Sequence, residues 1–149
     1  MTNPLQDLMP SVLAHAGTWV GSYRHIDSDG NTLDFHRSRV ECVFPERGPV
    51  VYLQKNQFTW EDGRCYRVEF GGVLRDGRIY WDTETFRGCG WAAGAQVFLL
   101  DLERKDEPGA RFYETIVMDA GQASRARTWH WFKDGRCYKR TLCDERRLD

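Results

Sequence analysis

Three side chains in this sequence could move or steer a proton on an organic molecule: His25, Glu114 and Asn56. An imidazole titrates close to neutral pH, so His25 can act as a general base. Glu114 lies in the apolar segment RFYETIVM, residues 111–118, where burial either raises the pKa of a carboxyl group or pairs it with an arginine. The amides of Asn56 and Gln54 can orient a carbonyl or hydroxyl group. These residue types predict acid–base chemistry that needs no cofactor.

Motifs for other kinds of chemistry are missing from the sequence. It has no G-x-S-x-G, P-loop, G-x-G-x-x-G or H-E-x-x-H pattern, which argues against nucleophilic hydrolases, nucleotide-binding enzymes and dehydrogenases. The five cysteines are odd in number and contain no C-x-x-C pair, which favours free thiols. No two of the four histidines have a spacing typical of a metal site, so we expect no metal. The histidines are His15, His25, His36 and His130.

Charge and hydropathy narrow the choice of partner. The chain has 21 basic and 22 acidic residues, so its net charge does not favour nucleic acid or an acidic membrane. No apolar run is long enough for a transmembrane helix, and the first residues lack the pattern of a signal peptide. We therefore expect a cytoplasmic protein whose partner is a small hydrophobic molecule. A homodimer is compatible with the sequence.

Four Asp-Gly pairs divide the chain into strand-like segments. Asp-Gly accepts the positive backbone angles of a tight hairpin turn. The segments between the turns are rich in β-branched and aromatic residues and lack a helical period. The pairs are Asp29-Gly30, Asp62-Gly63, Asp76-Gly77 and Asp134-Gly135. We predict nine or ten antiparallel strands, with segments at residues 18–26, 33–44, 50–60, 65–70, 78–86, 96–105, 111–118, 125–132 and 137–143.

So many consecutive strands would leave two exposed sheet edges unless the sheet closed on itself. We therefore predict an all-β protein, a closed antiparallel up-and-down barrel of about nine or ten strands that forms a single domain over residues 1–149. Residues 4–15 carry apolar side chains at helical spacing, and Pro10 limits them to short turns. This segment comes directly before the first strand, so we expect a helical plug at one end of the barrel.

The segment GTW, residues 17–19, resembles the G-x-W signature of the calycin superfamily, which includes the lipocalins. The resemblance implies that Trp19 lies inside the closed end of a lipocalin-like barrel. It also implies that an arginine from a late strand, either Arg127 or Arg140, packs across the indole ring. The strand count is more similar to the ten-stranded nitrobindin-like, fatty-acid-binding-protein-like and uncharacterised lipocalin-like bacterial barrels. The segment GTWVG, followed later by FTW, also resembles the nitrobindins, whose late-strand histidine holds haem. His130 has the corresponding place here, so the resemblance implies a haem protein as one alternative.

Alternation along a strand assigns side chains to faces once one residue is fixed. With Trp19 inside, Tyr23 and His25 also point inward. In residues 50–60, one face mixes aromatic rings with two amides, as the wall of a ligand cavity does. The residues that we predict to contact a ligand are Tyr23, Tyr52, Gln54, Phe58, Trp81, Arg127 and Trp129.

Residues 125–132 allow two orientations. Arg125 and Arg127 share a face with two tryptophans. If that face is internal, carboxylates must neutralise the arginines, because an unpaired buried charge is very costly. If it is external, the arginines flank the indole rings at the surface. The sequence leaves both orientations open. The acids available on strands are Glu41, Glu69, Glu84 and Glu114.

These features together predict a barrel that binds a small molecule. The leading hypothesis is a cofactor-independent enzyme, such as a lyase, isomerase, cyclase or hydratase, acting on an apolar aromatic, polyketide or terpenoid compound. The first alternative is a carrier that holds a hydrophobic ligand and performs no chemistry, and the second is a haem protein of nitrobindin type. A cavity that binds and a cavity that reacts use the same residue types, so the sequence does not separate enzyme from carrier.

Overall fold

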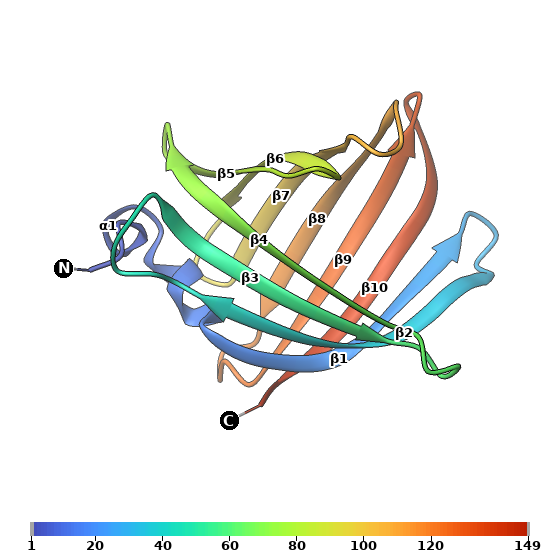
Figure 1. Cartoon of the computed structure of the whole chain (residues 1–149), viewed down its shortest axis with the longest axis horizontal. Coiled ribbons are helices and arrows are strands. Elements are labelled where there is room, and N and C mark those ends of the chain that lie inside the picture. The colour runs from blue at the N-terminus through green and yellow to red at the C-terminus, as the bar shows by residue number, and fades with distance from the viewer. Residues whose placement is uncertain (1, 149) are drawn as a thin grey trace.

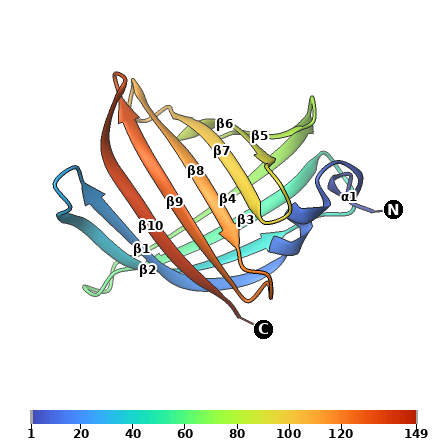
Figure 2. The same ribbon diagram turned by 180° about the vertical axis from the view of Figure 1, so that it is seen from behind.

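The chain folds into a closed antiparallel barrel of ten strands, as the sequence predicts. We describe it from a computed structural model, in which residues 2–148 are described. Each strand pairs with its neighbour in the chain, and β1 pairs with β10 to close the barrel (Figure 1, Figure 2). The strands are β1 (Gly17–Asp27), β2 (Thr32–Val43), β3 (Val50–Thr59), β4 (Cys65–Arg75), β5 (Arg78–Asp82), β6 (Phe86–Ala92), β7 (Val97–Arg104), β8 (Ala110–Met118), β9 (Ser124–Lys133) and β10 (Arg136–Leu148).

All four Asp-Gly pairs lie at hairpin turns. They connect β1 to β2, β3 to β4, β4 to β5 and β9 to β10. In two of the turns both residues have positive φ angles: 51° and 77° at Asp76 and Gly77, and 50° and 80° at Asp134 and Gly135. Positive φ at both central residues belongs to a type I′ turn, whose twist matches that of the flanking strands. The turn residues therefore determine where the chain reverses.

Residues 78–86 form parts of two strands, so the prediction of one strand there is wrong. β5 ends at Asp82, and the backbone N–H of Phe86 then donates a hydrogen bond to the hydroxyl of Thr83 at 3.0 Å, which turns the chain. β6 has the sequence FRGCGWA, and its glycines hide the strand pattern. A Cβ atom at Gly90 would lie 2.8 Å from the ring of Phe98. The close packing of β6 on β7 therefore requires a glycine at a place where sequence patterns predict a break.

A helical segment closes the barrel at the end where β1 begins. It consists of α1 (Leu5–Leu8) and the 3-10 helix η1 (Pro10–His15), so the helix is limited to short turns as expected. In Figure 1 and Figure 2 this segment lies at the opposite end from the β1–β2 hairpin. Asn3 Nδ2 donates a hydrogen bond to the carbonyl of Val51 at 2.7 Å, which attaches the segment to β3. Neither helical piece has the length or the apolar run needed to span a membrane.

Trp19 is fully buried at this closed end, as the G-x-W resemblance implies. Its indole N–H donates a hydrogen bond to the carbonyl of His15 at 2.9 Å, which joins η1 to β1. Two guanidinium groups pack against the indole. The group of Arg125, from β9, lies 4.5 Å from the ring centroid, and that of Arg147, from β10, lies 4.3 Å from it.

Neither Arg127 nor Arg140 takes the place across Trp19 that the resemblance implies. Arg127 lies two residues further along β9, where its guanidinium group contacts the ring of Trp129 at 4.7 Å. Arg140 is exposed. The expectation is wrong because β10 continues to Leu148, five residues beyond its predicted end, and the residue that pairs with Trp19 is Arg147.

His15 makes the closed end sensitive to acid. Its Nδ1 accepts a hydrogen bond from Arg125 Nη1 at 2.9 Å, so the imidazole is neutral in the folded protein. Burial, and then the charges of Arg125, Arg127 and Arg147, lower the pKa of His15 from 6.5 to about 3. The unfolded chain, with its ordinary pKa, binds the extra proton between these two values. Stability is therefore lost as the pH falls from 6.5 towards about 3.

We expect the free energy of unfolding in urea to fall by up to about 1.4 kcal/mol per pH unit because of this residue as the pH is lowered from neutral. The variant His15→Gln keeps an acceptor for Arg125 but cannot take up the proton, so its stability should depend less on pH. The variant His130→Gln, at an exposed site, should match the wild type. Equal pH dependence in the wild type and in His15→Gln would show that His15 is not responsible.

Candidate functional site

A cavity of about 440 Å³ lies inside the barrel. Every residue predicted to be catalytic or to bind a ligand lines it, in agreement with the inward faces that alternation assigned on β1 and β3. The structure gives the positions of these side chains, whereas their roles in binding or catalysis remain predictions. The residues are Tyr23, His25, Tyr52, Gln54, Asn56, Phe58, Trp81, Glu114, Arg127 and Trp129.

Much of the remaining wall is apolar and aromatic. Phe70, Phe98, Phe112 and Trp131 line the cavity from β4, β7, β8 and β9. The rings of Phe112 and Trp131 lie 4.6 Å apart, so this side of the cavity forms a continuous aromatic surface. Such a surface can pack against a flat, apolar group.

Buried arginine–glutamate pairs show which way β9 faces. Arg125 and Arg127 point inward and are only 3% and 5% exposed. Arg125 Nε donates to Glu145 Oε1 at 2.7 Å, and Arg127 Nε donates to Glu114 Oε2 at 2.8 Å. Arg127 Nη1 also lies 3.5 Å from Glu145 Oε1. Among the acids that the sequence offers as partners for these arginines, Glu114 is confirmed as the partner of Arg127. Glu145 escapes notice because it lies beyond Cys143, where the predicted strand ends.

Glu114 is held as the partner of Arg127. Burial raises the pKa of its carboxyl group, and the charge and hydrogen bond of Arg127 oppose that rise. Arg127 Nη1 donates a second hydrogen bond, at 2.8 Å, to the hydroxyl oxygen of Tyr23. The sequence allows Glu114 to be either a free acid or a structural partner. The geometry favours the structural role, because the Glu114–Arg127 pair fixes Tyr23 in the cavity wall.

Side chains on the inner face of β3 form a directed chain of hydrogen bonds. The hydroxyl of Tyr52 donates to Gln54 Oε1 at 3.0 Å, and Gln54 Nε2 donates to Asn56 Oδ1 at 2.9 Å. Within residues 2–148, no acceptor is paired with the amide nitrogen Nδ2 of Asn56. This nitrogen is therefore a donor at the end of the chain, placed to bind an oxygen atom of a ligand.

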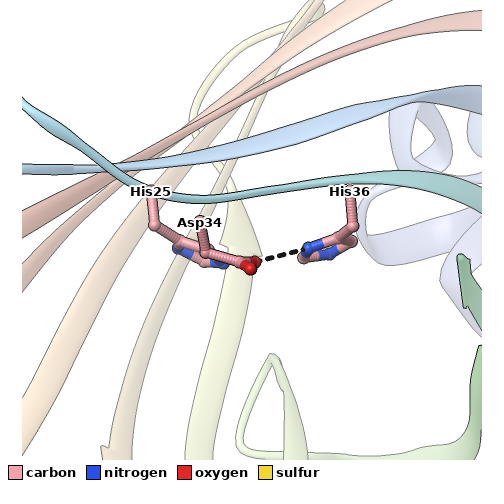
Figure 3. A group of neighbouring side chains, drawn as sticks. All are labelled: His25, Asp34 and His36. Atoms are coloured by element: carbon pink, nitrogen blue, oxygen red, sulfur yellow. Dashed lines mark hydrogen bonds and ion pairs between the residues drawn. The ribbon is translucent and has the colours of Figure 1, made fainter. Parts of the chain in front are cut away.

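His25, Asp34 and His36 lie near the β1–β2 hairpin, at the end of the barrel opposite the helical segment, which we call the mouth (Figure 1). Figure 3 shows the three side chains close together. In the β1–β2 ladder His25 lies opposite Asp34, and His36 lies two residues further along β2, so all three side chains point to one face. His36 Nδ1 lies 2.8 Å from Asp34 Oδ2. The indole N–H of Trp60 donates to Asp34 Oδ1 at 2.9 Å, and His25 Nδ1 lies 2.7 Å from Thr141 Oγ1.

These contacts determine which nitrogen of His36 is free. Burial acts against ionisation of Asp34, but hydrogen bonds from His36 and Trp60 lower the pKa of its carboxyl group. The ionised Asp34 can accept the Nδ1 proton of His36, and in that tautomer of the neutral ring the lone pair is on Nε2. The His36 ring lies between the rings of Tyr23 and Trp60, with centroid distances of 5.0 and 4.5 Å. His36 is therefore an oriented base next to an aromatic cavity.

The same three side chains could instead hold a divalent metal ion. Each offers one ligand atom, and these atoms lie within 4.8 Å of one another. Two imidazoles and one carboxylate suit ions such as Zn²⁺ or Fe²⁺. A metal ion bound through His36 Nδ1 would displace the proton that this nitrogen shares with Asp34. Sequence spacing misses this group because the pairing of β1 with β2 brings His25 to Asp34.

His130 lies on the outer face of β9 and is exposed. It alternates with Trp129, whose side chain lines the cavity. A late-strand histidine at this position therefore cannot ligate a haem iron inside the barrel. The haem alternative loses the residue on which it depended.

Comparison with known proteins extends the description of the fold. No protein-family model matches the chain, and no curated protein matches it in sequence. The S-type phycobiliprotein lyase CPES from Guillardia theta has a TM-score of 0.72 and 12% identity, over 92% of this chain and 90% of that chain. Rv2717c from M. tuberculosis has a TM-score of 0.64 and 13% identity, over 96% of this chain and 100% of that chain.

A third solved structure is longer than this protein. It is a protein of unknown function from the DUF3598 family of Nostoc punctiforme, with a TM-score of 0.68 and 15% identity over 92% of this chain. The match covers only 49% of the Nostoc chain, so this chain spans about half its length. At such low identities these likenesses show the fold alone. The closed ten-stranded barrel fits a calycin-like fold and encloses a cavity.

Breaking the Glu114–Arg127 pair should destabilise the barrel. The variant Glu114→Gln leaves the guanidinium group of Arg127 buried with less negative charge beside it. We expect the free energy of unfolding in urea to fall by about 3 kcal/mol. The double variant Glu114→Leu/Arg127→Met removes both charges and should be more stable than the single variant. A Glu114→Gln variant within about 0.5 kcal/mol of the wild type would contradict a stabilising ion pair.

Proposed function

We propose that the barrel binds an apolar, aromatic molecule and moves a proton on it, as a cofactor-independent lyase, isomerase, cyclase or hydratase. The observation that carries this proposal is His36, oriented by Asp34 beside an aromatic cavity. A carboxylate that holds one nitrogen of an imidazole leaves the other nitrogen ready to accept a proton. Apolar walls around such a base exclude competing water.

His36 Nε2 is the proton acceptor in this proposal. After it takes up a proton, Nδ1 keeps its hydrogen bond to Asp34, and the carboxylate stabilises the positive charge of the ring. The rings of Tyr23 and Trp60 hold the imidazole plane in place. Burial, and then the charge of Lys139, lowers the pKa of His25 to about 4, so His25 stays neutral beside the base.

Asn56 has the complementary role of orienting the reacting group. Its amide nitrogen is the free end of the hydrogen-bond chain along β3 and can donate to a carbonyl or hydroxyl oxygen. Glu114 has a structural role, because Arg127 holds its carboxylate. Of the residues predicted as catalytic, the proposal therefore keeps Asn56, places His25 next to the base and assigns the proton transfer to His36.

A carrier of a hydrophobic ligand is the second candidate. The most deeply buried charges of the barrel form arginine–glutamate pairs, and much of the cavity wall is apolar. Such a cavity can store a hydrophobic ligand without performing chemistry on it. Enzyme and carrier both bind an aromatic molecule. Only turnover distinguishes them.

Proton abstraction can be measured without the natural substrate. The probe 5-nitrobenzisoxazole is a flat aromatic molecule: a base removes its carbon-bound proton while its N–O bond breaks, giving a nitrile and a coloured phenolate. We expect the wild type to open this ring faster than buffer does. General bases typically contribute about 10²- to 10⁴-fold, so His36→Gln should lose at least about tenfold in rate.

The exposed His130 provides the matched control. His130→Gln removes one imidazole from the outer face and should keep the full rate. EDTA should leave the wild-type rate unchanged, because the proposed base is His36 and not a metal-bound hydroxide. If His36→Gln keeps the wild-type rate, His36 is not the base. Quenching of tryptophan fluorescence by the probe, with no ring opening in the wild type, would make the protein a carrier.

A further inference from the structure

Lys139 is a cation at the mouth of the barrel with no acidic partner. It lies opposite Trp131 in the pairing of β10 with β9, and it lines the cavity. Its Nζ atom is 4.2 Å from the centroid of the Trp131 ring. Within residues 2–148, Lys139 forms no salt bridge. The guanidinium group of Arg104 lies 5.6 Å from the same ring, so a second cation is present at this side of the mouth.

Three acids near this end of the cavity each have a partner of their own. Asp106 and Glu107 are held by basic side chains and Asp34 by hydrogen bonds from His36 and Trp60, so none of the three forms a salt bridge with Lys139. The pairs are Arg104–Asp106 at 2.7 Å, Lys133–Glu107 at 3.6 Å and His36–Asp34 at 2.8 Å.

The ammonium group of Lys139 is half-buried and has lost part of its hydration. Burial lowers the pKa of its ammonium group, and the charge of Glu107 opposes that change. A charge that has lost part of its hydration gains most from an opposite charge placed beside it. Much of the cavity wall that Lys139 adjoins is aromatic. We therefore expect the negative charge beside Lys139 to belong to a ligand whose remaining part is apolar.

We propose that the ligand of this barrel is an aromatic carboxylic acid, or an apolar acid of similar shape, whose carboxylate binds Lys139 Nζ at the mouth. Its apolar body fills the cavity. This inference rests on the proposed function, because it names the substrate class for the same site. Lys139 is close enough to His25 for its charge to lower the pKa of that imidazole. The carboxylate therefore lies at the same rim as His36, and the atom that loses a proton lies within a few bonds of it.

A matched pair of probes tests the inference. 1-Pyrenebutyric acid and 1-pyrenebutanol share an aromatic body and differ in the carboxylate, and both accept excitation energy from tryptophan. We expect the wild type to bind the acid about tenfold more tightly than the alcohol. Lys139→Met should remove this preference and leave the affinity for the alcohol within about twofold. Lys139→Arg, which keeps the charge, should retain most of the preference.

Arg140 supplies the control, because it is adjacent in the chain but exposed. Arg140→Met changes the net charge by the same amount as Lys139→Met and should keep the preference for the acid. If the wild type binds the acid and the alcohol equally, the inference is overturned while an aromatic ligand remains supported. If neither probe binds, the proposed function and the inference fail together. A preference that survives in Lys139→Met would also overturn the inference.

Thermal unfolding and near-ultraviolet circular dichroism establish that the variants are folded. The ionic strength gives an independent measurement on the unmodified protein. Binding of the acid should weaken as salt is added, whereas binding of the alcohol should not, because only the acid is attracted by a charge. If salt affects both probes equally, Lys139 does not select the carboxylate.

Discussion

The barrel depends on the need to neutralise two arginines that β9 places in its interior. Arg125 and Arg127 are almost completely buried, and removing one partner of such a pair typically costs about 3–5 kcal/mol. Their partners Glu114 and Glu145 belong to the two strands that flank β9, so the charges are satisfied only when β8, β9 and β10 are in register. The guanidinium group of Arg125 also packs on Trp19 from β1. The same interaction therefore links the last strands of the barrel to the first.

This arrangement divides the interior into two ends with different properties. At the closed end the charges form pairs, and the helical segment covers them through the Trp19–His15 hydrogen bond. At the mouth, polar groups retain unused capacity: His36 has a free nitrogen, and Lys139 has no acidic partner within residues 2–148. Polar groups of a cavity wall that have no partner in the protein are those that a ligand can satisfy. The closed end provides stability, and the mouth is where binding and chemistry are proposed.

Local patterns predict much of this molecule. Asp-Gly pairs mark four turns, and alternation from Trp19 places Tyr23 and His25 inside. What escapes prediction depends on pairing between strands. Glu145 lies beyond the predicted end of β10, and β6 is hidden by its glycines. The alternation of side chains along one strand does not predict that His25 lies beside Asp34, because this contact depends on the register of the β1–β2 hairpin. Distances along a chain describe one strand, whereas a site in a barrel is built from neighbouring strands.

The placement of His25, Asp34 and His36 on a single hairpin bears on how such a protein can evolve. All three belong to one contiguous stretch of twelve residues, whose turn is exposed, whereas the ion pairs at the closed end join β8, β9 and β10. Substitutions in this hairpin can alter the reactive groups without touching the residues that keep the barrel shut. The proposed chemistry and the stability thus depend on separate parts of the chain. A lineage built on this scaffold could vary the proposed site by changing this short hairpin.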